Sequence, residues 1–353
     1  MNSMQYAAGE ALLKDADKLA ERITDRQYEL QPELDQKFGQ SGRIRTKQDS
    51  LYSLNFLAES VMMRSPVLFT NYVSWLKTLL KGYRVTDEDI RINLLLIKEM
   101  IEEYFEYSDK ELVLEYLELG MVEVGLAEPA PRFVREELPY YMEAKLYLDQ
   151  LLSGNRLAAA AIVEEMAKDH IPIKDIYTYI FQMTQHEIGR LWQTGEITVA
   201  QEHFCTAATQ ANISRLYPYW LTKSAKGHRI VSACVGNEQH EIGLRLLTDQ
   251  FEMEGWDTYY LGANVPNNSL IDSLLKYKAD VLALSATMTY HVHLVRELII
   301  QVRNHPKTAA VKVLVGGMPF NTASMLWKEV GADGYAEDAK GAIALANKLI
   351  SAK

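Results

Sequence analysis

The 353-residue chain lacks the features that mark several classes of protein. It has only two cysteines, Cys205 in a predicted helix and Cys234 in a predicted buried strand, and these cannot make a disulfide framework. No apolar run is long enough to span a membrane, and the sequence shows no signal peptide. We therefore expect a cytoplasmic protein without a membrane partner.

Positive charge is also scarce, since 37 Lys and Arg stand against 47 Asp and Glu, for a net charge of −10. This balance argues against broad binding of nucleic-acid phosphates, which requires a basic surface. The sequence contains no helix-turn-helix with a basic recognition helix, no glycine-rich phosphate loop, no catalytic nucleophile and no carboxylate dyad. We therefore expect neither a DNA-binding protein nor an enzyme.

The length fits two or three domains, and the apolar spacing predicts three. Residues 1–137 form an N-terminal helical domain, with helices expected at 48–63, 67–80, 86–107 and 109–126. Residues 138–224 form a four-helix bundle, with helices at 139–152, 155–168, 173–192 and 199–216. Residues 227–353 alternate strands and helices. The predicted fold class is all-α followed by α/β, the latter a Rossmann-like, doubly wound parallel sheet.

One short stretch after the first predicted strand, residues 230–235, organises this last domain. Glu238, His240 and Gly243 follow the strand at its carboxyl end, where open α/β sheets bind ligands. A carboxylate two residues before a histidine can fix the imidazole tautomer and make the ring a good metal ligand. Taken alone, a loop histidine is more often simply solvated.

Two further strand ends stand at characteristic distances. Ser285 and Thr287 follow the apolar strand 281–284, and 41 residues (244–284) separate them from Gly243. Gly316 and Gly317 end the strand 311–315, and 28 residues (288–315) separate them from Thr287. Parallel strands present their carboxyl ends at one edge, so the three motifs meet there.

Together these motifs resemble the cobalamin-binding domain shared by methionine synthase, the corrinoid proteins of methyltransferases and the cobalamin-dependent light sensors. The family pattern is Asp-x-His-x-x-Gly, then Ser-x-Leu or Ser-x-Thr, then Gly-Gly, at these separations. The resemblance implies that His240 is the lower axial ligand of cobalt, in place of the cofactor's own dimethylbenzimidazole, and that Glu238 and Ser285 orient the imidazole. Glu238 stands where methyltransferase proteins usually carry Asp.

The same resemblance implies contacts with the nucleotide tail and the corrin. Glycines leave room where the backbone lies close to the tail. The implied contact residues are Gly243, Val265 in the loop 261–266, Thr287, Gly316, Gly317, Tyr335 and Ala336.

A second signature lies just before this domain. Trp192 is followed by nine residues (193–201) and then by Glu202 and His203. This spacing resembles light sensors that use adenosylcobalamin, in which the tryptophan and a valine, here Val199, cap the upper face of the corrin and the Glu-His pair lines the adenosyl pocket. In the light-responsive repressors of that group a histidine directly after the tryptophan captures cobalt. This sequence has Gln193 there, which leaves His186 or His203 as substitutes.

The resulting hypothesis is a photoreceptor that binds adenosylcobalamin. Light would cleave the cobalt–carbon bond and change a homo-oligomer, a dimer or a tetramer, whose output partner the sequence does not identify. The alternative is a corrinoid carrier protein of a methyltransferase system.

The N-terminal domain adds a second hypothesis, because the architecture resembles the photocobilins, which pair cobalamin with a bilin. Biliverdin is the candidate second chromophore, held without a covalent bond, with its carboxylates paired by Arg43, Arg45, Lys47 or Arg64. The tyrosines would line its pocket, and the alternative is that they simply fill helix interfaces. They are Tyr28, Tyr52, Tyr72, Tyr83, Tyr104, Tyr107 and Tyr116.

A last pair of candidate ligands, His291 and His293, follows the Ser-x-Thr motif. Two residues apart on a helix their side chains diverge by roughly 200°. We therefore predict residues on the helix surface and no metal site.

Overall fold

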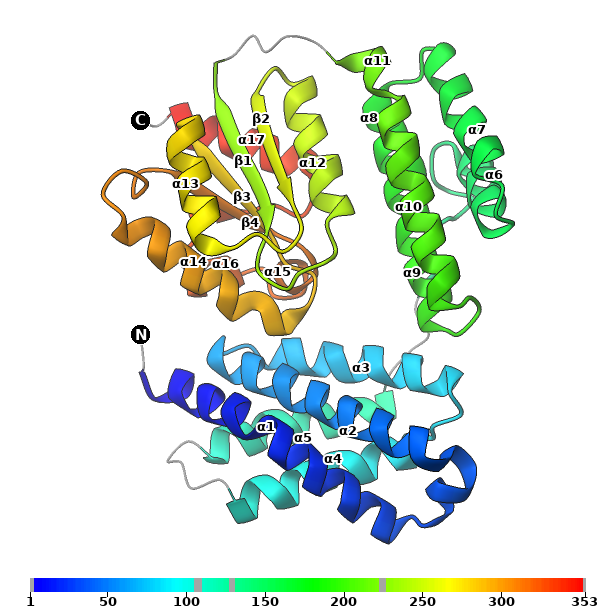
Figure 1. The fold of residues 1–353 in the computed structure, drawn as a ribbon, viewed down its shortest axis with the longest axis vertical. Coiled ribbons are helices and arrows are strands. Elements are labelled where there is room, and N and C mark those ends of the chain that lie inside the picture. Colours follow the sequence, from blue (N-terminus) through cyan, green and yellow to red (C-terminus); the bar gives the residue numbers. More distant parts are fainter. Residues whose placement is uncertain (1–2, 105–109, 127–130, 222–226, 352–353) are drawn as a thin grey trace. The chain divides into compact units, whose positions relative to one another are not determined.

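A computed structural model describes residues 3–104, 110–126, 131–221 and 227–351 (Figure 1). Two compact units make up the chain, and neither is continuous in sequence. The first comprises Met1–Glu128, Ala286–Gln301 and Val315–Tyr335, and the second comprises Pro129–Ser285, Val302–Leu314 and Ala336–Lys353. The predicted division into domains 1–137, 138–224 and 227–353 stays a prediction.

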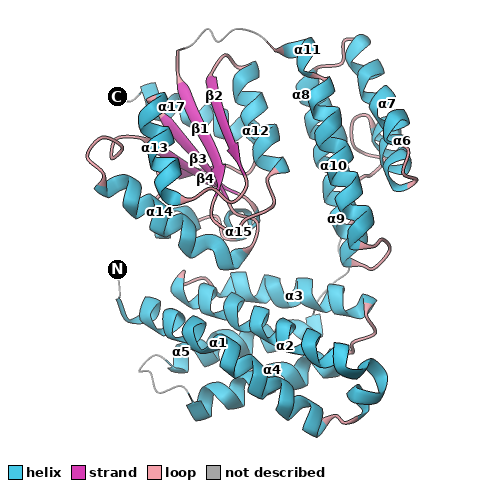
Figure 2. Cartoon of the chain, in the orientation of Figure 1, coloured by secondary structure: helices cyan, strands magenta, loops and turns pink. Residues whose placement is uncertain are grey.

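The N-terminal part is helical, as predicted (Figure 2). Its helices close around a core of fully buried aliphatic and aromatic side chains, which supplies most of the stability of amphipathic helices. Thr86 and Asp89 form a reciprocal cap at the start of the fourth helix, where Asp89 N–H donates to Thr86 Oγ1 at 3.1 Å and Thr86 N–H donates to Asp89 Oδ2 at 2.8 Å. The helices are α1 Ser3–Leu30, α2 Glu33–Met62, α3 Pro66–Gly82, α4 Asp87–Tyr104 and α5 Lys110–Leu126.

The predicted four-helix bundle is present, with one departure. The expected helix at 173–192 is divided, because a stretch of π-helix widens it between residues 176 and 182. Thr198 and Gln201 form a capping box at the start of the last long helix. The elements are α6 Tyr141–Leu152, α7 Arg156–Lys168, α8 Ile173–Asp175, η1 Ile176–Gln182, α9 Met183–Gln193, α10 Val199–Arg215 and the short α11 Tyr217–Trp220.

The C-terminal part is the predicted parallel sheet with helices. Its strands are β1 Arg229–Cys234, β2 Asp257–Gly262, β3 Val281–Ser285, β4 Lys312–Gly316 and β5 Gly334–Tyr335, in the order β2-β1-β3-β4-β5. β1 is buried over residues 230–234 and β3 over residues 281–284, and both are mostly apolar because the two faces of a central parallel strand are covered. The sequence did not predict β2 and β5. The remaining elements are α12 Ile242–Met253, α13 Asn267–Tyr277, η2 Thr289–His291, α14 Val292–Asn304, α15 Met318–Thr322, α16 Leu326–Glu329 and α17 Ala339–Ser351.

The strand order fixes where a ligand is expected. In an open sheet of order 2-1-3-4-5 the chain reverses direction of winding between β1 and β3, and ligands bind outside the carboxyl ends of the strands at this switch point. Cys234, the last residue of β1, pairs with Ser285, the last residue of β3. The first two predicted motifs therefore begin at neighbouring strand ends.

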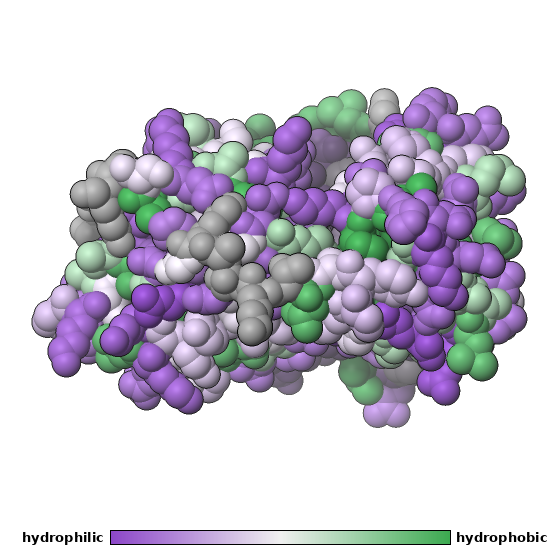
Figure 3. Space-filling model, turned by 90° about the horizontal axis from the view of Figure 1, so that it is seen from above, coloured by the Kyte–Doolittle hydropathy of each residue, from purple (hydrophilic) through white to green (hydrophobic). Residues whose placement is uncertain are grey.

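The outer surface is mixed in character. On the face in Figure 3, apolar residues are dispersed among hydrophilic ones. No helix in the described ranges has the length and apolar character needed to cross a bilayer. Cys205 and Cys234 are buried free thiols, as expected from the absence of a disulfide framework.

Candidate functional site

Glu238 and His240 form a close pair in the loop after β1. The carboxylate of Glu238 is fully buried, and its Oε1 lies 2.5 Å from His240 Nδ1. The same oxygen accepts the His240 backbone N–H at 3.0 Å. The imidazole itself is 57% exposed. One ring nitrogen is thus held by a carboxylate, while Nε2 is left for a ligand outside the loop.

The electrostatics of this pair follow from its contacts. The hydrogen bond that the imidazole donates to Glu238 raises the pKa of His240, against the opposing effect of burial. The negative charge of Glu202, on α10, adds to the same effect. A histidine polarised by a buried carboxylate is more basic at its free nitrogen, which is the arrangement that protein imidazoles use to bind metals.

Glu241, which the sequence analysis did not single out, ties the loop to its surroundings. Its Oε2 accepts hydrogen bonds from Tyr260 Oη and from the Ala263 backbone N–H, both at 3.0 Å. Its Oε1 accepts one from Gln210 Nε2, on α10, at 3.2 Å. Glu241 therefore links the His240 loop both to the end of β2 and to the helical bundle. Its position directly after His240 was the only signal in the sequence.

The loop after β2, which contains Val265, is hydrogen-bonded to the end of β1 and to the loop that follows β1. The Val265 backbone N–H donates to Cys234 O at 3.3 Å, and the Asn264 N–H donates to Glu238 O at 3.1 Å. Gly243 lies on an exposed part of α12, and a Cβ added there would meet open space. The predicted place of Gly243 beside a cofactor tail stays a prediction.

The ends of β3 and β4 contact each other through backbone atoms. The Ala286 N–H donates to Gly316 O at 3.2 Å, and a Cβ added to Gly317 would lie 2.0 Å from Ala286 O. Gly317 also has a φ of 104°, which disfavours other residues. Protein packing alone therefore accounts for this glycine. Thr287 lies partly buried in the same turn.

Tyr335 and Ala336 occupy the end of β5. Both are partly buried, and Ala336 packs against the core of the sheet domain. Their predicted contact with the cofactor tail stays a prediction.

The bundle presents the second predicted group. Trp192 is half-buried near the end of α9, and Val199, the first residue of α10, is 52% exposed. Glu202 Oε2 lies 2.5 Å from His203 Nδ1, whose side chain is 76% exposed, and Glu202 Oε1 accepts a hydrogen bond from Thr206 at 3.0 Å. These residues stand at the same end of the bundle.

The two substitutes for cobalt capture differ in placement. Gln193 is buried, and its position therefore cannot offer an exposed ligand. His186 stacks edge-on with Phe133, with ring centroids 5.1 Å apart, and burial lowers its pKa. The side chains of both His186 and His203 are exposed.

The prediction that His291 and His293 are surface residues is wrong. His291 is 6% exposed in the short helix η2, and the His293 side chain is 22% exposed at the start of α14. His293 Nδ1 lies 2.7 Å from Glu59 Oε2, on α2. The sequence could not indicate this partner, because 234 positions separate the two residues. Among the described residues there is no cluster of His, Cys, Asp or Glu that could hold a metal ion by itself.

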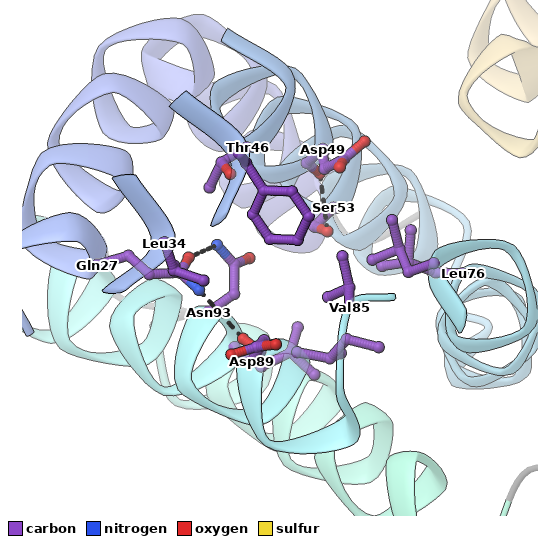
Figure 4. Close-up of a pocket in the computed structure, with 13 residues that line it drawn as sticks. Gln27, Leu34, Thr46, Asp49, Ser53, Leu76, Val85, Asp89 and Asn93 are labelled. Atoms are coloured by element: carbon purple, nitrogen blue, oxygen red, sulfur yellow. Dashed lines mark hydrogen bonds between the residues drawn. The ribbon is translucent and has the colours of Figure 1, made fainter. Parts of the chain in front are cut away.

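The N-terminal helices enclose a small cavity between α1, α2, α3 and α4 (Figure 4). Its volume is about 60 Å³. An engineered cavity of about 150 Å³ in another protein admits one benzene molecule, so this cavity is too small for an open-chain tetrapyrrole. The lining residues are Gln27, Leu34, Phe38, Thr46, Asp49, Ser53, Leu76, Leu80, Val85, Asp89, Ile90, Asn93 and Leu94.

The tyrosines and cations proposed for a bilin have other roles. Tyr28, Tyr72 and Tyr116 are buried in the helical core. Arg43 makes two hydrogen bonds to Asp35, at 2.9 and 2.7 Å. The remaining tyrosines are exposed, except that Tyr107 lies outside the described residues; they are Tyr52, Tyr83 and Tyr104.

Two B12 binding domain profiles match the chain, one over residues 144–217 and the other over residues 228–344. A corrinoid protein of Desulfitobacterium hafniense (strain Y51) is 30% identical over 169 residues, which are 46% of this chain and 76% of that protein. The chain belongs to the B12-binding corrinoid protein family. Both profiles lie beyond residue 143, so the N-terminal helices are an addition to the part that the family shares.

Other relatives agree with this assignment. A dimethylamine corrinoid protein of Methanosarcina barkeri is 26% identical over 207 residues, 58% of this chain and 95% of that protein. The structure of the monomethylamine corrinoid protein of the same organism covers 60% of this chain and all of that chain, with a TM-score of 0.54 and 22% identity. That likeness supports the fold.

These relatives overturn the photoreceptor hypothesis, and with it biliverdin as a second chromophore. The similar sequences are corrinoid proteins, among them one named for dimethylamine, which favours the alternative, a corrinoid carrier. The error has a physical cause. The pattern of Trp192, Val199, Glu202 and His203 is a short spacing of four residues, and such a spacing does not identify the reaction that a cofactor carries out.

The residues present fit a corrinoid cofactor. The His240 imidazole is exposed, oriented by a buried carboxylate and placed at the switch point of the sheet. Glycines with open space beside them, Gly236 and Gly243, flank it.

Proposed function

We propose that this chain is a corrinoid carrier protein that holds cobalamin through His240 and exchanges methyl groups with separate methyltransferase subunits. The observation that carries the proposal is the contact between His240 Nδ1 and the fully buried Glu238 carboxylate, together with the exposure of the ring. When bound, the cofactor supplies a cobalt atom that accepts a methyl group and gives it up again. The protein itself then needs no nucleophile or general base.

The residues of the chain divide the remaining work. Glu238 keeps the imidazole proton at Nδ1, so that the lone pair of Nε2 is available to cobalt. Glu241 holds the loop in place through Gln210, Tyr260 and the Ala263 N–H. Ser285, which pairs with Cys234 across the strand ends, and Thr287 are proposed to contact the nucleotide tail, with Gly316 and Gly317 beside them.

The cap residues shield the upper face in this proposal. Trp192 and Val199 supply apolar surface that excludes water, and Glu202 with His203 supply polar groups at its edge. A methyltransferase must reach the upper face of the cofactor at some stage. We therefore propose that the four cap residues lie at a surface that each methyltransferase partner contacts when it binds. A homo-oligomer remains a prediction that light scattering can test.

Cobalamin titration tests this function. We expect the full chain to bind methylcobalamin with an optical spectrum in which a protein imidazole replaces the cofactor's own base, and His240→Ala to lose that spectrum. A carrier should bind methylcobalamin at least as tightly as adenosylcobalamin. Absence of binding by the wild-type chain, or a strong preference for the adenosyl form, would refute the carrier function.

A further inference from the structure

The segment that leads from β3 into the first turn of α14, residues 286–293, contacts two other parts of the first unit. At one side Ala286 donates its N–H to Gly316 O and packs against Gly317. At the other side Tyr290 and His293 contact the N-terminal helix α2. The segment begins directly after Ser285, so anything that holds it also holds the end of β3.

The contact with α2 centres on Glu59. The Glu59 side chain is fully buried, and its Oε2 lies 2.7 Å from His293 Nδ1. Within the described part of the chain, its Oε1 has no hydrogen-bond partner. Burial raises the pKa of Glu59, and the bond to His293 opposes that effect. A carboxylate in such a place is costly, which makes its hydrogen bonds with the side chain and the backbone of His293 decisive for the local geometry.

Aromatic side chains reinforce the same contact. Tyr290 packs edge-on against Phe56 with ring centroids 5.3 Å apart, and it stacks with Tyr52 at 6.0 Å. Further along α14, the Arg296 guanidinium lies 4.4 Å from the centre of the Tyr6 ring. Met288 and Tyr290 belong to the shell of the N-terminal core itself. The start of the β3–α14 connection therefore packs against the core of the N-terminal helices.

We propose that Glu59 is a positioning residue for the corrinoid site. Through His293 it fixes residues 286–293, and through the chain it fixes Ser285 and Thr287 at the end of β3. The B12 binding domain profiles do not include the N-terminal helices. These helices therefore influence how tightly the chain binds cobalamin. The inference rests on the proposed function for its ligand, cobalamin.

A purely structural ion pair is the competing explanation, and the two make different predictions. If the pair only stabilises the fold, cobalamin affinity is unchanged in any variant that remains folded. Removal of one member of a buried ion pair typically costs about 3–5 kcal/mol of stability, so stability is measured beside affinity in every variant. Affinity that falls while stability is kept would therefore separate positioning from stabilisation.

The experiment uses the full chain with three replacements. Glu59→Leu removes the buried carboxylate together with its hydrogen bonds to His293, and Glu59→Gln keeps an oxygen acceptor. His293→Gln removes the pair from its more exposed side, in case the Glu59 variants fail to fold. Asp89→Asn is the matched control, because Asp89 is a buried carboxylate of the same helical domain that bonds to Thr86 and Gln31 instead of the segment.

Two readouts are measured at a temperature at which circular dichroism shows every variant folded. We expect cobalamin affinity to fall about tenfold in Glu59→Leu, a typical coupling between distinct sites, less in Glu59→Gln, and less than twofold in Asp89→Asn. Amide hydrogens of residues 286–293 should exchange faster in Glu59→Leu and His293→Gln than in the control. A variant that combines Glu59→Leu with His293→Gln should lose no more affinity than the larger single loss, because both replacements disrupt the same contact.

Equal affinity in wild type and Glu59→Leu, or faster exchange without any loss of affinity, would overturn the positioning role. If the wild-type chain itself binds no cobalamin, the proposed function fails instead. The two failures are thus distinguished by the wild-type titration alone.

Discussion

Replacement of Glu238 by Gln is the sharpest test of how the site works. In the structure one carboxylate oxygen accepts both the His240 backbone N–H at 3.0 Å and the imidazole Nδ1 at 2.5 Å, and the side chain is fully buried. The amide has almost the same shape and can present its oxygen to both donors. Only the charge is lost.

The size of the effect follows from that difference. A hydrogen bond to a charged group contributes about 1.5–3 kcal/mol and a neutral one about 0.5–1.5 kcal/mol, so loss of the charge should cost about 1–1.5 kcal/mol. At about 1.4 kcal/mol per factor of ten, cobalamin affinity should fall roughly tenfold. Glu238→Ala also frees the imidazole to rotate, and its loss should lie toward the upper end of the about 10–100-fold range known for partners of metal ligands.

The assay is a titration with methylcobalamin followed by absorbance, which reports both affinity and the fraction of cofactor with a protein imidazole. Glu187→Gln is the control, since Glu187 is also buried and bonds to Arg190 at 2.8 Å and to the Phe133 N–H at 2.7 Å. We expect this control to match wild type. If Glu238→Gln and Glu238→Ala bind as tightly as wild type with an unchanged spectrum, Glu238 does not orient the ligand and the reasoning is wrong.

Three further predictions concern stability and the link between the bundle and the sheet. Burial raises the pKa of Asp249 to about 6. The protonated group therefore contributes about 3 kcal/mol to the free energy of unfolding below its ordinary pKa of about 4, and this contribution is lost as pH rises through about 6. Denaturant unfolding at several pH values should show that Asp249→Asn removes this pH dependence. Gly317→Ala should destabilise the fold by about 3 kcal/mol or more, because a positive φ and a collision with Ala286 O add together, and a melting temperature equal to that of wild type would contradict the contact. Gln210→Ala should accelerate amide exchange in the loop that Glu241 holds without changing the exchange of α1, and protection equal to wild type would show that the hydrogen bond between them is not formed in solution.

The local patterns of the sequence were sufficient for much of the fold. Apolar spacing predicted the four bundle helices to within a few residues and three of the five strands, because periodic burial leaves a direct trace in the residue order. It did not predict β2, whose residues 257–261 are only partly buried and include the polar Asp257 and Thr258, or β5, which has two residues. The π-helical stretch at 176–182 also escaped, since its hydrogen-bond register is set by packing in the bundle.

The sequence by itself also determined where the candidate site residues lie in the sheet. Motif residues such as His240 and Ser285 follow β-strands at fixed distances, and parallel strands must deliver them to one edge of the sheet, so their order along the chain was enough. Only the tertiary structure decided which contacts come from distant segments. Glu59 meets His293 across 234 positions, and Gln210 meets Glu241 from another helix. Such pairs leave no periodic trace, because each depends on how separately formed elements pack together.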